Sequence, residues 1–275
     1  MENFFVDLAT NVKHALAEDI GAGDINVKLL ANNNIIAQLI SRESAILCGT
    51  AWFEETFKQL DNKVKFDWLV KDKDNIEPNQ CLCTITGTAR TLLTAERSAI
   101  NFLQLLSGTA TETQRYVKAI ADTKAKILDT RKTIPGLRRA QKYAVYCGGG
   151  TNHRMGLYDA FLLKENHLAA AGSVTKAIIA ARNYAPNLPI EVEVETLEQI
   201  TEALNAKAER LLLDNFTLSK LNTAVNMVQG QVELEASGGI TLENIHTIAK
   251  TGVDFISIGA ITKNIQATDF SMRVT

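Results

Sequence analysis

The sequence contains little cysteine, and its four cysteines form no disulfide-like framework. Two of them, Cys81 and Cys83, alternate as residues on a strand would, and no second pair of Cys or His residues stands near them. A zinc site is not expected, because a tetrahedral site needs four ligands at workable spacing. We expect all four to be free thiols in a reducing cytoplasm: Cys48, Cys81, Cys83 and Cys147.

The sequence also lacks a long apolar run. No stretch approaches the roughly 18 consecutive apolar residues that a membrane span needs. The first residues, Met1–Asp7, contain neither a basic segment nor a long apolar one, so we expect no secretory signal. These two features together predict a cytoplasmic protein.

Overall charge is small, with a formal net charge of -2 over 275 residues. One segment, residues 131–164, nevertheless holds seven Lys and Arg residues and His153 against a single acid, Asp159. Cations gathered in one part of a neutral chain indicate a pocket for a highly anionic small ligand. A nucleic-acid surface would more often make a whole domain basic.

The first third of the chain has the pattern of a small mixed α/β domain. Strand-like runs over residues 35–40, 63–70 and 81–86 are separated by turns at 61–62 and 77–80. A helix is predicted over residues 92–106, with Gly108 ending or bending it. Its polar stripe of Arg97, Asn101 and Gln104 is typical of a solvated helix face.

From residue 127 onward, short apolar runs alternate with helical segments, which predicts parallel βα units. Six such strands are visible, fewer than the eight of a closed barrel, so closure of the sheet stays open. The predicted strands cover residues 126–129, 160–163, 189–194, 210–213, 232–236 and 254–258.

Charged residues or glycines follow each of these six runs. Parallel α/β proteins assemble their sites at the carboxyl ends of strands, so we interpret these positions as one catalytic face. Any one of the polar residues could instead cap a helix. The positions are Asp129–Lys132, Lys164, Glu193 with Glu195, Asp214, Ser237–Gly239 and Gly259–Ala260.

Two of the strand ends contain glycine turns, at residues 236–240 and 257–262. Glycine lets the backbone approach an oxyanion closely, and a following helix start points free N–H groups at it. Both turns therefore predict a phosphate site, although ordinary turns would have the same composition.

Glu191, Glu193 and Glu195 alternate with apolar residues and would point into a barrel. Buried carboxylates are costly unless a metal, a cation or ligand hydroxyls compensate them. With Asp214 on the next strand, they suggest a Mg²⁺-assisted diphosphate or polyol site. An edge strand with a solvated glutamate face is the alternative. Lys164 could form a Schiff base, bind a phosphate, or keep its ammonium group in water.

The motifs occur in the same order as those of the quinolinate phosphoribosyltransferases, the decarboxylating nicotinate-nucleotide pyrophosphorylases of NAD biosynthesis, which the chain strongly resembles. The similarity begins at Glu18–Asp24 and runs almost to the C-terminus. It rests on Glu96–Asn101, Asp129–Thr133, Pro135–Arg138, Lys142–Tyr143, Gly148–Arg154, Lys164–His167, Glu191–Glu195, Leu213–Phe216, Glu235–Ile240 and Gly259.

The resemblance implies an α/β fold: an N-terminal α/β sandwich domain followed by an incomplete, six- to seven-stranded α/β barrel of the type II phosphoribosyltransferase kind. The implied domains are residues 1–107 and 108–267, and a tail at about 268–275 could pack back on the first. The protein is expected to be a homodimer that binds no nucleic acid and no membrane.

The same resemblance implies an enzyme that transfers the phosphoribosyl group of phosphoribosyl pyrophosphate (PRPP) to quinolinate. The products would be nicotinate mononucleotide, pyrophosphate and CO₂. Mg²⁺ would accompany PRPP, and no organic cofactor is expected.

Residue roles are likewise implied by the resemblance. Quinolinate would be bound by Arg131, His153, Arg154 and Lys164, with Arg97 donated by the partner subunit. PRPP would be bound by Thr130, Lys132, Glu193, Asp214, Ser237, Gly238, Gly239, Ile258, Gly259 and Ala260. The expected catalytic residues are Lys132, Lys164, Glu193 and Asp214, and Glu193 and Asp214 would hold Mg²⁺, directly or through water.

Three other functions compete with this interpretation. One is a paralogous phosphoribosyltransferase of the same fold that acts on another anionic heterocycle. A second is a Schiff-base lyase that uses Lys164. A third is a phosphometabolite sensor, which the Glu193 and Asp214 pair disfavours because acids beside cations suit turnover more than anion capture.

Overall fold

The structure, a computed structural model, describes residues 3–275; residues 1 and 2, where the predicted first domain begins, lie outside it. The chain forms two compact units. The first comprises residues 3–114, 133–149 and 260–275, and the second comprises residues 115–132 and 150–259. The boundary expected at residues 107 and 108 stays a prediction.

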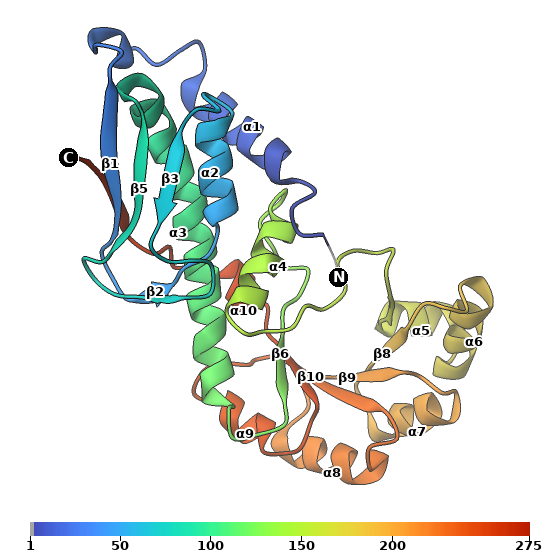
Figure 1. Cartoon of the computed structure of the whole chain (residues 1–275). Helices are drawn as coiled ribbons and strands as arrows, with labels where there is room; N and C mark the ends of the chain where they lie inside the picture. The colour runs from blue at the N-terminus through green and yellow to red at the C-terminus, as the bar shows by residue number, and fades with distance from the viewer. Residues whose placement is uncertain (1–2) are drawn as a thin grey trace. The chain divides into compact units, whose positions relative to one another are not determined.

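The first unit contains a four-stranded antiparallel sheet in the order β12-β1-β5-β3. The strands are β1 (Asn34–Ser41), β3 (Lys65–Trp68), β5 (Cys81–Thr88) and β12 (Phe270–Val274). The C-terminal strand β12 pairs with β1, so both ends of the sequence contribute to this unit (Figure 1). A small second sheet pairs β2 (Ala45–Ile46) with β4 (Asn75–Ile76).

The core of this unit lies between its sheet and its helices. Phe53 and Phe57 of α2 pack with Leu82 and Ile85 of β5 in a cluster of fully buried side chains. Alternation along the strands supplies one apolar face, and the helices cover it. The helices are α1 (Leu8–Ile20), a 3₁₀ turn η1 (Val27–Leu29), α2 (Thr50–Lys58), residues 89–114 of α3 (Ala89–Ala119), α4 (Arg138–Cys147) and α10 (Ala260–Lys263). Leu92 and Leu103 of α3 belong to the same buried cluster.

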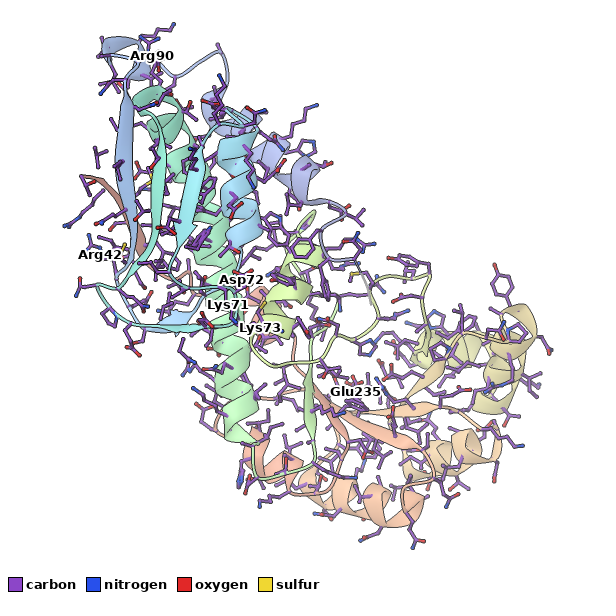
Figure 2. All side chains as sticks on the ribbon, in the orientation of Figure 1. Arg42, Lys71, Asp72, Lys73, Arg90 and Glu235 are labelled. Atoms are coloured by element: carbon purple, nitrogen blue, oxygen red, sulfur yellow. The ribbon has the colours of Figure 1, made fainter. Side chains whose placement is uncertain are left out.

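The start of α2 is fixed by an acid from a distant turn. The Asp72 carboxylate accepts from the backbone N–H groups of Gly49 and Thr50, both at 3.2 Å, and from the hydroxyl of Tyr143 at 2.9 Å. Figure 2 labels Asp72 together with its sequence neighbours Lys71 and Lys73. A carboxylate at a helix N-terminus satisfies its free amides and is favoured by the helix dipole.

The long helix α3 (Ala89–Ala119) continues well beyond Gly108, so the prediction that this glycine ends the helix is wrong. The reason for glycine here is tertiary contact. A Cβ built on Gly108 would lie 2.1 Å from the carbonyl oxygen of Gln266, which is closer than any real contact. The missing side chain allows the C-terminal segment to cross α3, and the helix hydrogen bonds are unaffected.

The second unit is a six-stranded parallel sheet in the order β6-β11-β10-β9-β8-β7. All six predicted strands are confirmed: β6 (Lys126–Leu128), β7 (Phe161–Leu163), β8 (Ile190–Val194), β9 (Arg210–Asp214), β10 (Glu233–Ser237) and β11 (Phe255–Ser257). Among the described strands, β6 and β7 do not pair with each other, so the sheet is an open, incomplete barrel. The predicted fold class is confirmed.

Helices connect the parallel strands along the outer side of this sheet (Figure 1). They are α5 (Glu165–Ala171), α6 (Val174–Tyr184), α7 (Leu197–Asn205), α8 (Leu218–Val228) and α9 (Ile245–Ala249). Ser173, Thr196 and Thr217 each cap the helix that follows, by accepting from a backbone N–H three residues later. The caps of α7 and α8 set where the loops after β8 and β9 end and those helices begin, and the cap of α6 sets where the turn after α5 ends.

Within residues 3–275, no helix combines the length and the apolar character needed to cross a membrane.

The close approach at Gly108 yields a test in which two effects have opposite signs. Helix propensity alone predicts that Gly108→Ala stabilises the protein by about 1 kcal/mol. We expect instead a loss of about 1–3 kcal/mol in the free energy of unfolding, because the methyl group meets the Gln266 carbonyl. Chemical denaturation measures it, with Asn101→Ala on the exposed face of the same helix as control, expected to change stability by about 0.5 kcal/mol or less. Unchanged or higher stability for Gly108→Ala would contradict the close approach.

Candidate active site

A cavity of about 260 Å³ opens at the carboxyl edge of the parallel sheet. All of its lining residues belong to the second unit. It is lined by Thr130, Arg131, Lys132, His153, Arg154, Leu162, Lys164, Glu193, Leu212, Asp214, Glu235, Ser237 and Ser257. Parallel strands end at one edge of a sheet, so side chains that are distant in sequence meet there.

Nine of the predicted site residues are among those that line this cavity: Thr130, Arg131, Lys132, His153, Arg154, Lys164, Glu193, Asp214 and Ser237. Arg97 is not one of them. It lies on α3 in the first unit, where it lines a separate cavity with Asp19, Asp24 and Thr94.

The predicted glycine turns lie close to the same residues. A Cβ on Gly259 would lie 2.8 Å from Cδ of Lys132 and 3.5 Å from Oγ1 of Thr130, so only glycine fits there without displacing Lys132. Gly238 has φ +96°, and its Cβ would lie 2.1 Å from Oδ1 of Asn215. Both positions need glycine, one for space and the other also for its left-handed backbone.

The remaining predicted positions follow these glycines. Gly239, with φ +60°, continues the turn after Ser237, and Ile258 is buried with its N–H bonded to the carbonyl of Leu128 at 3.0 Å. Ala260 begins α10.

Two arginines give the cavity its positive charge. Partial burial lowers the pKa of Arg154, and the nearby guanidinium of Arg131 lowers it further. Two cations that destabilise each other in this way are both stabilised when an anion binds between them. The Arg154 side chain is held by a hydrogen bond from Nη1 to the carbonyl of Ala160, at 3.2 Å.

The loop that carries Arg154 has no regular secondary structure, yet its backbone is fully held. The four N–H groups of residues 153–156 all donate to side chains. Asp129 accepts the N–H of His153 at 2.9 Å, and Nδ1 of His153 accepts that of Arg154 at 2.7 Å. The two oxygens of Asp159 accept the N–H groups of Met155 and Gly156 at 2.6 and 2.9 Å. Asp159, the one acid of the cationic segment, therefore orders the loop.

Lys164 forms an ion pair with Glu193 at the edge of the cavity. Partial burial raises the pKa of Glu193, Lys164 opposes this rise, and the charge of Asp214 adds to it. An ammonium group in an ion pair is not a nucleophile, so this geometry gives no support to the Schiff-base alternative.

The site also contains two buried acids: Glu191, which the sequence analysis grouped with Glu193 and Glu195 as inward-pointing acids of a Mg²⁺ site, and Glu235, to which it gave no role of its own. Glu235 is fully buried on β10 and Glu191 nearly so on β8, and both lie against His153. Glu235 is labelled in Figure 2. The alternating glutamates of residues 191–195 and 233–235 were the signal that could have found this pair. The expectation that Glu195 also points inward is wrong, because β8 ends at Val194 and Glu195 is exposed.

Leu162, Leu212 and Ser257 line the cavity as well. The sequence analysis included Ser257 in a predicted phosphate turn without naming it as a site residue, and it missed Leu162 and Leu212. Both leucines lie inside strands, so a search of strand ends alone could not detect them.

Three acids line the cavity: Glu193, Asp214 and Glu235. Of these, Glu235 lies against His153, and Glu193 and Asp214 have no described ion pair with it. Their oxygens suit Mg²⁺, which prefers carboxylates together with water and substrate phosphates. Among the described residues, neither belongs to a cluster of three metal-ligating side chains. The donor set therefore fits a magnesium ion that takes most of its ligands from a bound diphosphate and from water.

The cysteines lie elsewhere, and all four are free thiols. Cys48, Cys147 and Asp72 have ligand atoms within 4.8 Å of one another. Burial raises the pKa of the Cys48 thiol, and Cys147 adds to this. The Asp72 oxygens already cap α2, so the cluster has a structural explanation.

An open parallel α/β sheet with a cation-lined cavity and two close-approach glycine turns at its carboxyl edge defines a class: α/β enzymes that act on a phosphorylated, strongly anionic substrate. Two family models match the chain within this class. The quinolinate phosphoribosyl transferase N-terminal domain matches residues 24–107, and the C-terminal domain of the same family matches residues 109–273. The chain belongs to the quinolinate phosphoribosyltransferase family.

Individual relatives agree with this assignment. The chain is 40% identical over 266 residues to a probable nicotinate-nucleotide pyrophosphorylase (carboxylating) of Bacillus subtilis, covering 96% of this chain and 92% of the relative. It is 42% identical over 272 residues to the nicotinate-nucleotide pyrophosphorylase (carboxylating) of Mycobacterium leprae, covering 95% of each. The solved structure of the nicotinate-nucleotide pyrophosphorylase from Francisella tularensis superposes with a TM-score of 0.97 at 47% identity over the whole of both chains.

The buried acids make a prediction about stability and pH. Burial, with Glu191 beside it, raises the pKa of Glu235 from 4.5 to about 8. Between about pH 4.5 and 8 the folded chain keeps a proton that the unfolded chain releases, so this group's contribution to stability falls as pH rises through that window. We expect the free energy of unfolding of the wild type, relative to Glu235→Gln, to decrease from pH 5 to pH 8.

Glu202→Gln serves as the control in the same denaturation series. The N–H of Thr175, 2.8 Å away, lowers the pKa of Glu202, so this acid titrates below the window in both states. Its difference from wild type should stay level between pH 5 and 8. A level difference for Glu235→Gln as well would show that Glu235 does not hold its proton.

Proposed function

We propose that this chain transfers the phosphoribosyl group of PRPP to quinolinate with decarboxylation, giving nicotinate mononucleotide, pyrophosphate and CO₂ in de novo NAD biosynthesis. The observation that carries the proposal is the cavity in which Arg131, Arg154 and Lys164 lie with Glu193 and Asp214. Membership of the family, with relatives named for this reaction, supports it.

Quinolinate is a dicarboxylate, so the site must hold two like charges close together. Planar guanidinium groups bind carboxylates with two parallel hydrogen bonds, which lysine cannot do. Arg131 and Arg154 are therefore the principal carboxylate ligands in the proposal, with His153 and Lys164 completing the set. Arg97 would come from the partner subunit of a homodimer.

PRPP would occupy the acidic and glycine-rich side of the cavity. Thr130 and Lys132 would contact its diphosphate, and Glu193 and Asp214 its ribose hydroxyls. The backbone of two turns would surround the 5′-phosphate, where glycine allows close approach. These turns are Ser237–Gly239 and Ile258–Ala260.

The reaction follows from the charges assembled there. The pyridine nitrogen attacks the anomeric carbon while the bond to pyrophosphate breaks, and Lys132 offsets the negative charge on the leaving group. Arg131 and Arg154 hold the ring in line for this attack. The resulting pyridinium stabilises the electron pair left on the adjacent ring carbon when its carboxylate leaves as CO₂, and that carbon then takes up a proton from solvent to give nicotinate mononucleotide. When bound, Mg²⁺ at Glu193 and Asp214 would neutralise part of the diphosphate charge.

A cytoplasmic homodimer belongs to the proposal too.

The first test of the function is an assay with PRPP, Mg²⁺ and either quinolinate or nicotinate. With quinolinate, we expect one CO₂ released for each nicotinate mononucleotide formed. Turnover of another anionic heterocycle in place of quinolinate would favour the paralogous transferase.

Removal of one guanidinium tests the dicarboxylate site. Arg154→Ala should lose about 2–5 kcal/mol of binding or transition-state stabilisation, because a buried carboxylate of the substrate is left unpaired. Arg154→Lys restores the charge without the planar fork and should recover only part of it. Steady-state kcat/KM for quinolinate measures both variants. Near-normal CO₂ release by Arg154→Ala would exclude this role for the residue.

The acidic side makes a separate prediction. Asp214→Asn should need about 10–100 times more Mg²⁺ for half-maximal activity, because it removes a charge that helps hold the ion. A magnesium titration of PRPP-dependent turnover measures this. Asp122→Asn controls for loss of charge, since Asp122 is exposed and pairs with Lys250 at 2.7 Å, outside the cavity lining. Equal magnesium requirements in the two variants would remove Asp214 from the proposed metal site.

A further inference from the structure

Two carboxyl groups are buried at the cationic cavity, and one of them, Glu235, contributes to its lining. Glu235 on β10 is 0% exposed, and Glu191 on β8 is 6% exposed. Arg210 approaches Glu235 at 3.7 Å but makes a shorter contact of 2.8 Å with Glu233. Buried carboxyl groups are costly to fold, and replacing them with apolar residues is often neutral or stabilising. Their presence therefore calls for a role other than stability.

Both acids meet at one ring nitrogen of His153. Nε2 of His153 lies 3.0 Å from Glu191 and 3.6 Å from Glu235. The other ring nitrogen, Nδ1, accepts the backbone N–H of Arg154 at 2.7 Å, so it carries no proton. The proton of the neutral ring is thus on Nε2, where it is donated to Glu191, and the Glu235 carboxyl group lies beside this contact.

This arrangement connects the buried acids to the backbone of Arg154. Asp129 accepts the backbone N–H of His153, and Asp159 accepts those of Met155 and Gly156. The side chain described as accepting the backbone N–H of Arg154 is that of His153. The guanidinium of Arg154 must stay close to the like charge of Arg131 before any anion binds. The fixed backbone and the hydrogen bond from Nη1 of Arg154 to the carbonyl of Ala160 together keep it there.

We propose that Glu191 and Glu235 are positioning residues for the dicarboxylate: they orient His153, and His153 fixes the backbone that aims Arg154 into the cavity. The proposal rests on the proposed function for the identity of the ligand. It deepens that function by giving His153 a role that acts through Arg154.

The charge of the pair is consistent with this role. Burial raises the pKa of both acids, that of Glu235 to about 8, so at neutral pH the pair carries less than two full negative charges. Two ionised carboxylates would instead cancel much of the positive charge that the arginines offer to a ligand.

Substitution of the acids separates positioning from stability. Glu191→Leu together with Glu235→Leu removes both carboxyl groups while keeping the interior filled. The loss of the acceptor for Nε2–H of His153 offsets the gain from removing two buried acids, so we expect a folded protein with a cooperative thermal transition. We expect the KM for quinolinate to rise about tenfold, the value of one lost charge-assisted hydrogen bond, and the KM for PRPP to stay within about twofold. Glu191→Gln alone keeps an acceptor for Nε2 and should remain close to wild type.

An unchanged quinolinate KM in the double variant would overturn the proposal. So would a parallel rise in both KM values, which would indicate a general structural defect.

Nitrogen NMR of histidine-labelled protein tests the arrangement without any assay of activity. In the wild type, the His153 ring should show the neutral form protonated at Nε2, and this signal should shift in the double leucine variant. A ring protonated at Nδ1 in the wild type would overturn the positioning role. Wild-type protein that shows the expected ring signal but does not turn over quinolinate would refute the proposed function alone.

Discussion

Two guanidinium groups, those of Arg131 and Arg154, are held in the lining of one cavity, and the site depends on keeping them there. Partial burial lowers the pKa of Arg154 and the charge of Arg131 lowers it further, so the charged form of Arg154 is held at a cost. A flexible loop would relieve the strain by letting the side chains move into water. The loop of residues 153–156 cannot do so, because four consecutive backbone amides donate to fixed side chains. The cavity is thus organised for an anion before the anion arrives, which is how electrostatic stabilisation becomes useful to an enzyme.

The parallel sheet provides the frame for this arrangement. Strands β8, β9 and β10 bring Glu193, Asp214 and Ser237 to one edge, while Glu191 and Glu235 lie deeper on the same strands. The ligand-facing acids and the buried acids are thus successive layers of one set of side chains, separated by the two-residue period of a strand. The outer layer suits a sugar and a metal, and the inner layer orders the anion-binding loop.

Glycine has two distinct uses in this chain. Gly259 admits Lys132 at the cavity, and Gly108 admits a backbone carbonyl across a helix that continues on both sides of it. In the sequence both glycines are typical of turns or helix ends, and helix propensity alone predicts that a glycine interrupts a helix. Only a segment folded against it from far along the chain explains why Gly108 leaves its helix intact.

Local pattern determined most of the fold and much of the site. The six parallel strands follow from apolar runs and their spacing, and the cavity residues Lys164, Asp214 and Ser237 follow from their place at strand ends, because parallel strands have a common carboxyl edge. Tertiary structure alone decided that α3 passes Gly108, that Glu195 turns to solvent while Glu191 is buried, and that Glu235 meets His153. The physical reason is that spacing fixes which face of its own element a residue occupies, whereas burial and partners depend on segments that are remote in sequence and are brought together only when the chain has folded.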